Sequence, residues 1–366
     1  MRILISPDKF KGSMTASEVA GGLADFFQEQ GHETAVLPIA DGGEGTARVL
    51  CDALGGSMES ATVSDPLGRP VEAEFAVAGK VAILEMSQAS GLWRLTRDEL
   101  DPWKASTFGT GELIRSAAER FSVEKIVIGI GGSATNDGGT GMAQALGIRF
   151  PGADSIPADL TSATGIDFTH AEEFPEIEVA CDVENPLLGE NGASRVYGPQ
   201  KGIREGDFEQ HEDRLCHLVQ MLGSAGQKLA DQPGSGAAGG LGFGLMAFCG
   251  AQLKPGFDLV ADLLELEIAV ANCDLVITGE GNLDRQTLQG KGPHGVARMA
   301  RRLGKRIIAV VGGTDQSDEV AREFDAVVSV PPHGMPVEEA MQRGPALLRE
   351  DEFRQALTGQ IAELGA

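Results

Sequence analysis

The sequence predicts an α/β protein of two domains, in which the first domain is interrupted by the second. Three observations support this fold class. The chain has 366 residues, more than one compact core usually accommodates. Apolar strand-like runs alternate with helical patterns near both termini, whereas the middle of the chain begins with short strands joined by turns. The 50 glycines cluster where apparent strands end, which is typical of loops lined by backbone.

The N-terminal part reads as a strand, a helix, a second strand and a second helix. A polar, glycine-bearing loop follows each strand, and ligands of open α/β sheets bind at these carboxyl ends. Ser13 or Thr15 can cap the first helix, because Glu18 stands in its first turn. The predicted elements are strand 2–6, loop 7–13, helix 16–30, strand 34–39, loop 40–46 and helix 46–54.

The pattern changes after the second helix. Short β-like runs separated by turns such as Asp65-Pro-Leu-Gly68 form a meander, so we predict a domain crossing near Asp65. A glycine-rich stretch at 234–244 continues as an apolar segment, unlike a flexible linker. The predicted elements are strands 61–64, 71–77, 81–86, 125–130 and 177–181, and helices 107–121, 138–146 and 207–230.

Alternation of strands and helices returns after residue 263. Three more strands are predicted, at 274–278, 306–311 and 326–330. Together with the two N-terminal strands they make a five-stranded parallel sheet. We therefore predict one discontinuous α/β domain of residues 1–64 and 264–366, and an inserted α/β domain of residues 65–263 with a mixed sheet.

The charge and composition argue against two classes of partner. With a formal net charge of −24, the general surface repels nucleic acids and anionic membranes. One tyrosine and two tryptophans offer few platforms for base stacking. The five cysteines form no CxxC pair, and the first residues resemble neither a signal peptide nor an anchor. We expect a cytoplasmic protein with no nucleic-acid and no membrane partner, and a homodimer is left open.

The stretch from Ile126 to Met142 suggests an anion-binding loop. A short apolar run breaks into glycines and small hydroxyl residues, so that backbone N–H groups can approach an anion at a helix N-terminus. Residues 129–134 also fit the dinucleotide pattern G-x-G-x-x-A, which leaves a nicotinamide-dependent hydroxy-acid oxidoreductase as an alternative. The mid-chain position, the missing acidic ribose partner and the polar continuation at 133–137 count against that alternative.

Charged residues at the apparent strand ends suggest phosphoryl transfer, although no Walker A loop or protein-kinase signature is present. That chemistry needs cations to stabilise charge, and carboxylates to hold Mg²⁺ or accept a proton. Asp41 and Asp137, taken singly, are also typical helix caps, and His211 and His217 are predicted to be surface residues. The candidates are Lys11, Lys201 and Lys291, with Asp8, Asp41, Glu44, Asp137, Asp182, Glu280 and Asp284.

Seven motifs give the chain a resemblance to a known family. They are Pro7-Asp-Lys-Phe-Lys-Gly-Ser13, Ala40-Asp-Gly-Gly-Glu-Gly-Thr46, Gly131-Gly-Ser-Ala-Thr-Asn-Asp-Gly-Gly139, Ala180-Cys-Asp-Val-Glu-Asn-Pro186, Gly198-Pro-Gln-Lys-Gly202, Gly234-Ser-Gly-Ala-Ala-Gly-Gly240 and Thr278-Gly-Glu-Gly-Asn-Leu-Asp-Arg-Gln-Thr287. In this order, nearly end to end, they resemble the bacterial glycerate kinase family, type I. Seven motifs in register are far more specific than one glycine-rich loop.

The resemblance implies a flavodoxin-like parallel-sheet domain interrupted by a second, mixed-sheet α/β domain, with a cleft between them. It also implies ATP-dependent phosphorylation of D-glycerate with Mg²⁺, at the 2-hydroxyl, to give 2-phosphoglycerate and ADP. Three alternatives stay open: the same kinase giving 3-phosphoglycerate, the nicotinamide-dependent oxidoreductase, and a non-catalytic nucleotide-sensing or scaffold protein. Two positions depart from the family pattern, which usually has Ser at Lys9 and often Arg at Asn282.

Residue roles follow from the resemblance together with this chemistry. A small hydroxy acid needs a cation for its carboxylate, and Lys11 is the first choice. Asp182 or Asp284 is expected to take the proton of the hydroxyl group. The full set is Lys11, Asp182 and Asp284 for catalysis; Asp8, Ser13, Lys201 and Lys291 for substrate; Gly131, Gly132, Ser133, Thr135, Asn136 and Gly236 for ATP; and Asp41 and Glu44 for Mg²⁺.

Overall fold

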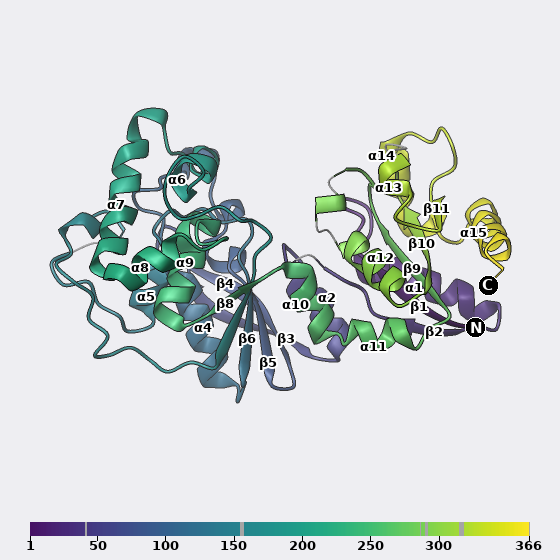
Figure 1. Cartoon of the computed structure of the whole chain (residues 1–366), viewed down its shortest axis with the longest axis horizontal. Helices are drawn as coiled ribbons and strands as arrows, with labels where there is room; N and C mark the ends of the chain where they lie inside the picture. The colour runs from purple at the N-terminus through teal and green to yellow at the C-terminus, as the bar shows by residue number, and fades with distance from the viewer. Residues whose placement is uncertain (41, 154–156, 286, 290–291, 315–317, 366) are drawn as a thin grey trace. The chain divides into compact units, whose positions relative to one another are not determined.

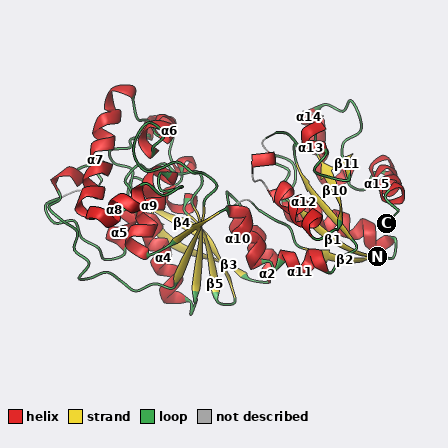
Figure 2. Cartoon of the chain, viewed as in Figure 1, coloured by secondary structure: helices red, strands yellow, loops and turns green. Residues whose placement is uncertain are grey.

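The computed structural model describes residues 1–365 apart from 41, 154–156, 286, 290–291 and 315–317. The chain divides into two compact units, and the strands form two separate sheets (Figure 2). The first unit consists of Met1–Asp41, Asp52–Gly55 and Phe257–Ala366, and the second consists of Gly42–Cys51 and Gly56–Gly256. Within the described ranges, no helix has the length and apolar character needed to cross a membrane.

The sheet of the first unit is parallel throughout and draws on both ends of the chain. Its strand order is β11-β10-β9-β1-β2, which confirms the predicted five-stranded parallel sheet. Figure 1 shows the purple N-terminal strands in one sheet with the green to yellow C-terminal strands. This order is that of a flavodoxin-like sheet, whose winding reverses between β1 and β9. The strands are β1 (Arg2–Pro7), β2 (Glu33–Val36), β9 (Leu275–Glu280), β10 (Arg306–Val311) and β11 (Ala326–Ser329).

Helices pack on both faces of this sheet. Ile3, Ile5 and Ile277 share a buried cluster with α1 and α15, and α12 packs against β1, β9 and β10. The predicted cap of α1 is confirmed at Thr15, whose hydroxyl accepts the N–H of Glu18 in a capping box. The helices are α1 (Ala16–Glu29), α10 (Gly256–Leu263), α11 (Leu266–Ala271), α12 (Gly292–Arg302), α13 (Asp318–Ala321), α14 (Val337–Leu347) and α15 (Asp351–Glu363), with a 3₁₀ turn at Thr287–Gln289.

The sheet of the second unit is mixed, as predicted. Its order is β3-β4-β5-β6-β7-β8; the pairs β3–β4 and β4–β5 are antiparallel, and the remaining pairs are parallel. Ile126 and Ile128 of β6 are fully buried between neighbouring strands and helices. The strands are β3 (Ser57–Ser64), β4 (Pro70–Ala78), β5 (Val81–Glu85), β6 (Lys125–Gly129), β7 (Glu176–Ala180) and β8 (Gln252–Lys254).

One helical prediction in the second unit needs correction. The single helix expected at 207–230 is broken at Gly223, whose φ of +61° ends one helix and begins another. Thr107 precedes α4 but makes no side-chain cap, because its hydroxyl bonds elsewhere. The helices are α2 (Thr46–Leu54), α3 (Ser87–Ser90), α4 (Phe108–Arg120), α5 (Thr140–Ala145), α6 (Ala193–Tyr197), α7 (Phe208–Met221), α8 (Gly223–Ala230) and α9 (Ala237–Cys249). Short 3₁₀ turns occupy Leu92–Arg94, Arg97–Glu99, Leu160–Ser162, Pro199–Lys201 and Glu205–Asp207.

The compact units and the predicted domain borders differ near both crossings. The prediction placed the borders after residues 64 and 263. In the structure β3 pairs with β4 along its whole length, from Ser57 to Ser64, and therefore belongs to the second sheet. The helix α2 contributes residues 46–51 to the second unit and residues 52–54 to the first. Strand pairing, which the composition does not reveal, decides where this strand belongs.

Candidate active site

A pocket opens at the carboxyl edge of the first unit's sheet, where the winding of the sheet reverses. The register pairs Pro7 of β1 with Gly279 of β9, so Asp8 and Glu280 follow neighbouring strand ends. The cavity volume is about 420 Å³. Ligands of open α/β sheets bind at this edge, and this volume is typical of pockets for drug-sized ligands. The pocket is therefore a candidate site by both position and size.

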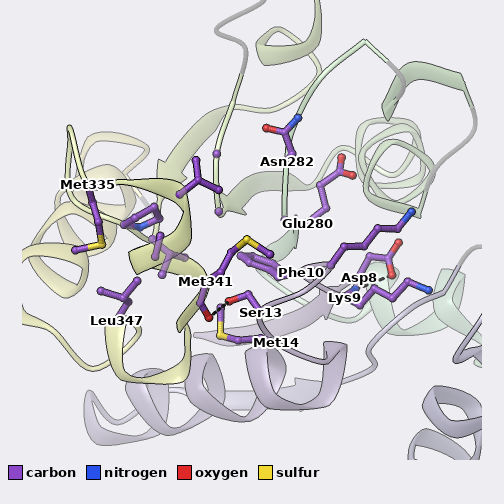
Figure 3. Close-up of a pocket in the computed structure, with 18 of the residues that line it drawn as sticks. Asp8, Lys9, Phe10, Ser13, Met14, Glu280, Asn282, Met335, Met341 and Leu347 are labelled. Carbon is purple, nitrogen blue, oxygen red and sulfur yellow. Dashed lines mark hydrogen bonds between the residues drawn. The ribbon is translucent and has the colours of Figure 1, made fainter. Parts of the chain in front are cut away.

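The lining of the pocket divides into a polar end and an apolar wall. Figure 3 shows Asp8, Lys9 and Glu280 on one side, with Met335 and Leu347 on the other. We call polar end the residues Asp8, Lys9, Lys11, Ser13, Glu280, Asn282 and Asp284. We call apolar wall the residues Met14, Pro331, Met335, Val337, Met341 and Leu347.

Two buried carboxylates lie at the polar end. Asp8 is 7% exposed and Glu280 is 6% exposed. The hydroxyl of Thr287 donates to Glu280 Oε1 at 2.6 Å, and the N–H of Lys9 donates to Asp8 Oδ1 at 2.6 Å. Buried carboxylates held by such bonds keep a fixed position. Glu280 was among the acidic candidates identified from the sequence, but no role was assigned to it. Its position at the end of an apolar strand is the sequence signal that it lies in the pocket.

Lys11 and Asp284 share this pocket with Asp8 and Ser13, as the shared strand edge led us to expect. The Lys11 side chain is exposed, and Asp284 is half-buried. Asn282 Nδ2 donates to Asp284 Oδ2 at 2.8 Å, and the N–H of Asp284 donates to Thr287 Oγ1 at 3.2 Å. The loop after β9 thus holds Asp284 from its side chain and its backbone.

Ser13 joins the loop after β1 to the helix α14. Gly344 has a φ of +25°, and Pro345 follows it within the helix. Pro345 lacks the N–H that would bond the carbonyl of Met341 in a regular helix, so that carbonyl needs another donor. The hydroxyl of Ser13 donates to it at 3.2 Å (Figure 3). Ser13 therefore links the polar end to the apolar wall.

In the second unit, a buried aspartate organises the glycine-rich loop that follows β6. Asp137 is 1% exposed, and its carboxylate accepts four hydrogen bonds. Oδ2 accepts from the N–H and hydroxyl of Thr107, both at 2.8 Å, and from Gly141 N–H at 3.2 Å; Oδ1 accepts from Gly139 N–H at 3.0 Å. Burial raises the pKa of Asp137 and the four hydrogen bonds oppose that rise. Asp137 thus fixes the entry to α5.

Lys201 also lies inside the second unit. Its side chain is 1% exposed, and its ammonium donates to the carbonyl of Thr135 at 2.7 Å. Burial lowers the pKa of Lys201 to about 7, although the charge of Asp137 acts to raise it. Through this hydrogen bond Lys201 stabilises the glycine-rich loop that follows β6.

The residues predicted to bind ATP form the surface and the interior of the same loop. Gly131 and Gly132 are exposed, whereas Ser133, Thr135 and Asn136 are buried. Asn136 Nδ2 donates to Ser194 at 2.9 Å, but Thr135 Oγ1 and Asn136 Oδ1 have no hydrogen-bond partner in the described part of the chain. Orphaned buried polar atoms are rare and mark sites where a partner is expected.

The remaining predicted residues are scattered. Asp182 is exposed and its Oδ1 accepts the N–H of Gly256 at 2.7 Å. Glu44 is exposed, and Gly236 is buried, with space for no side chain because a Cβ would lie 2.1 Å from the Pro186 carbonyl oxygen. Two further predicted residues, Asp41 and Lys291, lie outside the described residues.

His211 corrects the prediction of a surface residue. It is fully buried, hydrogen-bonds to the guanidinium of Arg214, and stacks on Trp103 with ring centroids 4.2 Å apart. Burial lowers the pKa of His211 to about 4, and the Arg214 charge adds to this effect. His217 is half-buried, and its Nε2 donates to the Ala163 carbonyl at 2.8 Å. The helix α7 therefore faces the core with polar residues as well as apolar ones.

The pocket of the first unit is lined by the acidic side chains of Asp8, Glu280 and Asp284. Within the described residues, no group of three or more His, Cys, Asp or Glu side chains could hold a metal ion. Mg²⁺ usually takes one or two protein carboxylates, with substrate phosphates and water as its other ligands. The neighbouring carboxylates of Asp8 and Glu280 fit that requirement.

Comparison with known proteins gives one consistent result. Residues 3–357 match the model of the glycerate kinase family. The chain is 42% identical over 363 residues to a glycerate kinase of Halalkalibacterium halodurans, covering 95% of each chain. It is 42% identical over 345 residues to glycerate 2-kinase of Escherichia coli K12, covering 90% of each. A solved structure assigned to glycerate kinase 2 of Salmonella typhimurium LT2 superposes with a TM-score of 0.88 at 40% identity, covering 100% of this chain and 99% of the other.

These similarities bear on the open alternatives. The resemblance drawn from the seven motifs is confirmed, because the family match spans nearly the whole chain. The similar proteins are kinases, and nothing among these findings supports the nicotinamide-dependent oxidoreductase.

Proposed function

This chain belongs to the glycerate kinase family, and we propose that it transfers the γ-phosphoryl group of ATP to D-glycerate. The proposed product is 2-phosphoglycerate, with ADP as the second product. The observation that carries the proposal is the polar end of the pocket at the sheet's switch point. An exposed cation, Lys11, lies there with the carboxylates of Asp8, Glu280 and Asp284. Phosphoryl transfer to a small hydroxy acid needs this combination of charges.

In this proposal Lys11 binds the carboxylate of glycerate. Lys11 is exposed and lines the pocket, so its ammonium is accessible to the carboxylate of a bound substrate. Asp8 and Ser13 contribute hydrogen bonds to the hydroxyl groups of the substrate. The same role for Lys201 has weaker support, because its buried ammonium already bonds the Thr135 carbonyl. For Lys291 the role remains a proposal from the sequence.

Asp284 is the proposed general base for the acceptor hydroxyl. It lines the same pocket as Lys11, and Asn282 holds its carboxylate from one side. A base must lie within hydrogen-bond reach of the proton it removes, so a shared pocket favours Asp284. Asp182 is the second candidate, and its carboxylate already accepts the N–H of Gly256 at the start of α10.

The phosphates of ATP are proposed to bind the loop at 131–136 and Gly236. Exposed glycines let backbone N–H groups approach an anion, and Gly132 adopts a φ of +73° that favours glycine. The orphaned hydroxyl of Thr135 supports a ligand at this loop. Mg²⁺ bound with ATP would neutralise phosphate charge. Glu44 and Asp41 are its proposed ligands from the sequence, and Asp8 and Glu280 are candidates from the pocket.

Product analysis tests the proposal. Wild-type protein is mixed with Mg-ATP and D-glycerate, ADP release is followed by a coupled assay, and the phosphorylated acid is identified by ³¹P NMR. We expect ADP release that depends on glycerate, and 2-phosphoglycerate as the product. A product of 3-phosphoglycerate would keep the kinase and change the hydroxyl. No ADP release with glycerate or related hydroxy acids would favour a nucleotide sensor instead.

Two further proposals concern the setting of the enzyme. The cytoplasm is the proposed location, because all five cysteines are free thiols, as expected in a reducing compartment. A homodimer is the proposed assembly, and analytical ultracentrifugation of the wild-type protein would decide between one and two chains.

A further inference from the structure

The apolar wall of the pocket has no part in the binding of glycerate. Every carbon of glycerate carries oxygen, so the substrate offers no apolar surface to these side chains. Placing its hydroxyl or carboxylate groups against them would cost free energy, because no hydrogen bond would replace those lost to water. A pocket of about 420 Å³ is also larger than a three-carbon acid fills. The wall therefore faces another ligand.

We propose that the apolar wall binds the adenine base of ATP. The inference rests on the proposed kinase function, under which ATP is the one substrate with a planar apolar part. The wall supplies three thioethers, from Met14, Met335 and Met341, and the apolar pyrrolidine ring of Pro331. Sulfur makes favourable contacts with aromatic rings, and a flexible methionine adapts to a flat surface. The sheet edge is also where this fold class places planar ligands.

The charges of the pocket agree with this assignment. The six side chains of the apolar wall carry no charge, which suits an uncharged base. Figure 3 shows Lys9 at the other end of the same cavity, which Lys11 also lines. The polar end is proposed to bind glycerate, so the apolar wall is the part of the cavity that suits an uncharged planar group.

The wall also contacts the loop that carries Lys11. A Cβ at Gly12 would lie 2.3 Å from Met341 Cε, so the methyl group of Met341 rests on the glycine. Substitution of Met341 would disturb both ends of the pocket. Met335 is the sharper target, because it is half-buried in the loop after β11 and lines the wall.

The test compares Met335→Ala with the conservative Met335→Leu and with the control Ile268→Ala. Ile268 is 58% exposed on α11 and does not line the pocket. For each protein we would measure the KM for Mg-ATP and for D-glycerate, and the Kd for adenosine and for tripolyphosphate by calorimetry. Tripolyphosphate carries the anionic tail without the base.

For Met335→Ala we expect the KM for Mg-ATP and the Kd for adenosine to rise about fivefold to tenfold, from the lost apolar contact. The KM for glycerate and the Kd for tripolyphosphate should stay within twofold. Met335→Leu should recover most of the loss, and Ile268→Ala should behave as wild type.

Three outcomes would overturn the inference. An active Met335→Ala enzyme with unchanged constants for Mg-ATP and adenosine would place the base elsewhere and leave the kinase proposal intact. Equal weakening of adenosine and tripolyphosphate would mean general damage to the pocket. Wild-type protein that binds tripolyphosphate but not adenosine would exclude a base site. Failure of the wild type to release ADP, with adenosine still bound at the wall, would instead count against the proposed kinase function alone.

Discussion

Asp137→Asn tests whether one buried carboxylate organises the glycine-rich loop. An asparagine that keeps its oxygen at the Oδ2 position can still accept from Thr107 and Gly141. Its amide nitrogen then faces the N–H of Gly139, and two donors meet where a bond of 3.0 Å existed. One buried donor left without an acceptor costs about 1–3 kcal/mol.

The three retained bonds also weaken, because a neutral acceptor replaces a charged one, at about 1 kcal/mol for each. Removal of a buried charge returns part of this cost. The net loss in the free energy of unfolding of the second unit is therefore about 2–4 kcal/mol. Asp231→Asn is a matched control, since Asp231 is exposed in the same unit and its carboxylate accepts only from the side chain of Gln227 among the contacts described.

Tryptophan fluorescence in urea is a suitable assay, because Trp93 and Trp103 both belong to the second unit. The transition therefore reports that unit without assuming that the whole chain unfolds in one step. A loss below about 0.5 kcal/mol for Asp137→Asn, the scale of an ordinary surface change, would refute the role assigned to the carboxylate.

Three other outcomes are expected. Burial lowers the pKa of Lys201 to about 7, so between pH 7 and 10.5 the unfolded chain holds a proton that the folded chain has released. The free energy of unfolding should therefore rise with pH in this window. Urea titrations of Lys201→Met should lack that rise. Ser13→Ala should destabilise the first unit by about 1 kcal/mol in calorimetry, and by less when Pro345→Ala restores a helical N–H for Met341; equal losses in both backgrounds would contradict the bond. Asp284→Asn should lower kcat by at least about a hundredfold with an unchanged circular dichroism spectrum, and near-normal turnover would move the base to Asp182.

The parallel sheet was predictable because its signal is local. The three central strands of the first unit, β1, β9 and β10, are short apolar runs followed by polar glycine loops, and burial on both faces requires such runs. The edge strand β2 is shorter than predicted, and its residues are mostly exposed. In an edge strand the apolar pattern is a weaker guide to the residue at which the strand ends than it is in a central strand.

The environments of single polar residues were harder to predict. Lys201 stands in a glycine-bearing loop, where a lysine is normally exposed, and only the packing of the second unit buries it. His211 lies in a helix with many charged residues, yet Trp103 packs on its ring from a segment far away in the chain, and Arg214 of the same helix hydrogen-bonds to it. Burial of this kind depends on tertiary contacts that no local pattern records.

The pocket was predictable in part. Its polar end follows from the rule that strand ends share one edge, which brings Asp8, Lys11 and Asp284 together. The apolar wall does not follow from any motif. No sequence pattern singles out Met335 and Met341, which line the pocket from the loop before α14 and from α14 itself; Met341 contacts Gly12 and Ser13 of the loop after β1.

The central claim is that the exposed ammonium of Lys11 binds the substrate of a glycerate kinase. The kcat/KM for D-glycerate, measured by ADP release for wild type and Lys11→Ala at saturating Mg-ATP, tests it most directly. Loss of one electrostatic donor should cost about 2–4 kcal/mol of transition-state stabilisation, which is a fall of about 30-fold to 1000-fold. A Lys11→Ala enzyme with kcat/KM close to that of wild type would contradict the account.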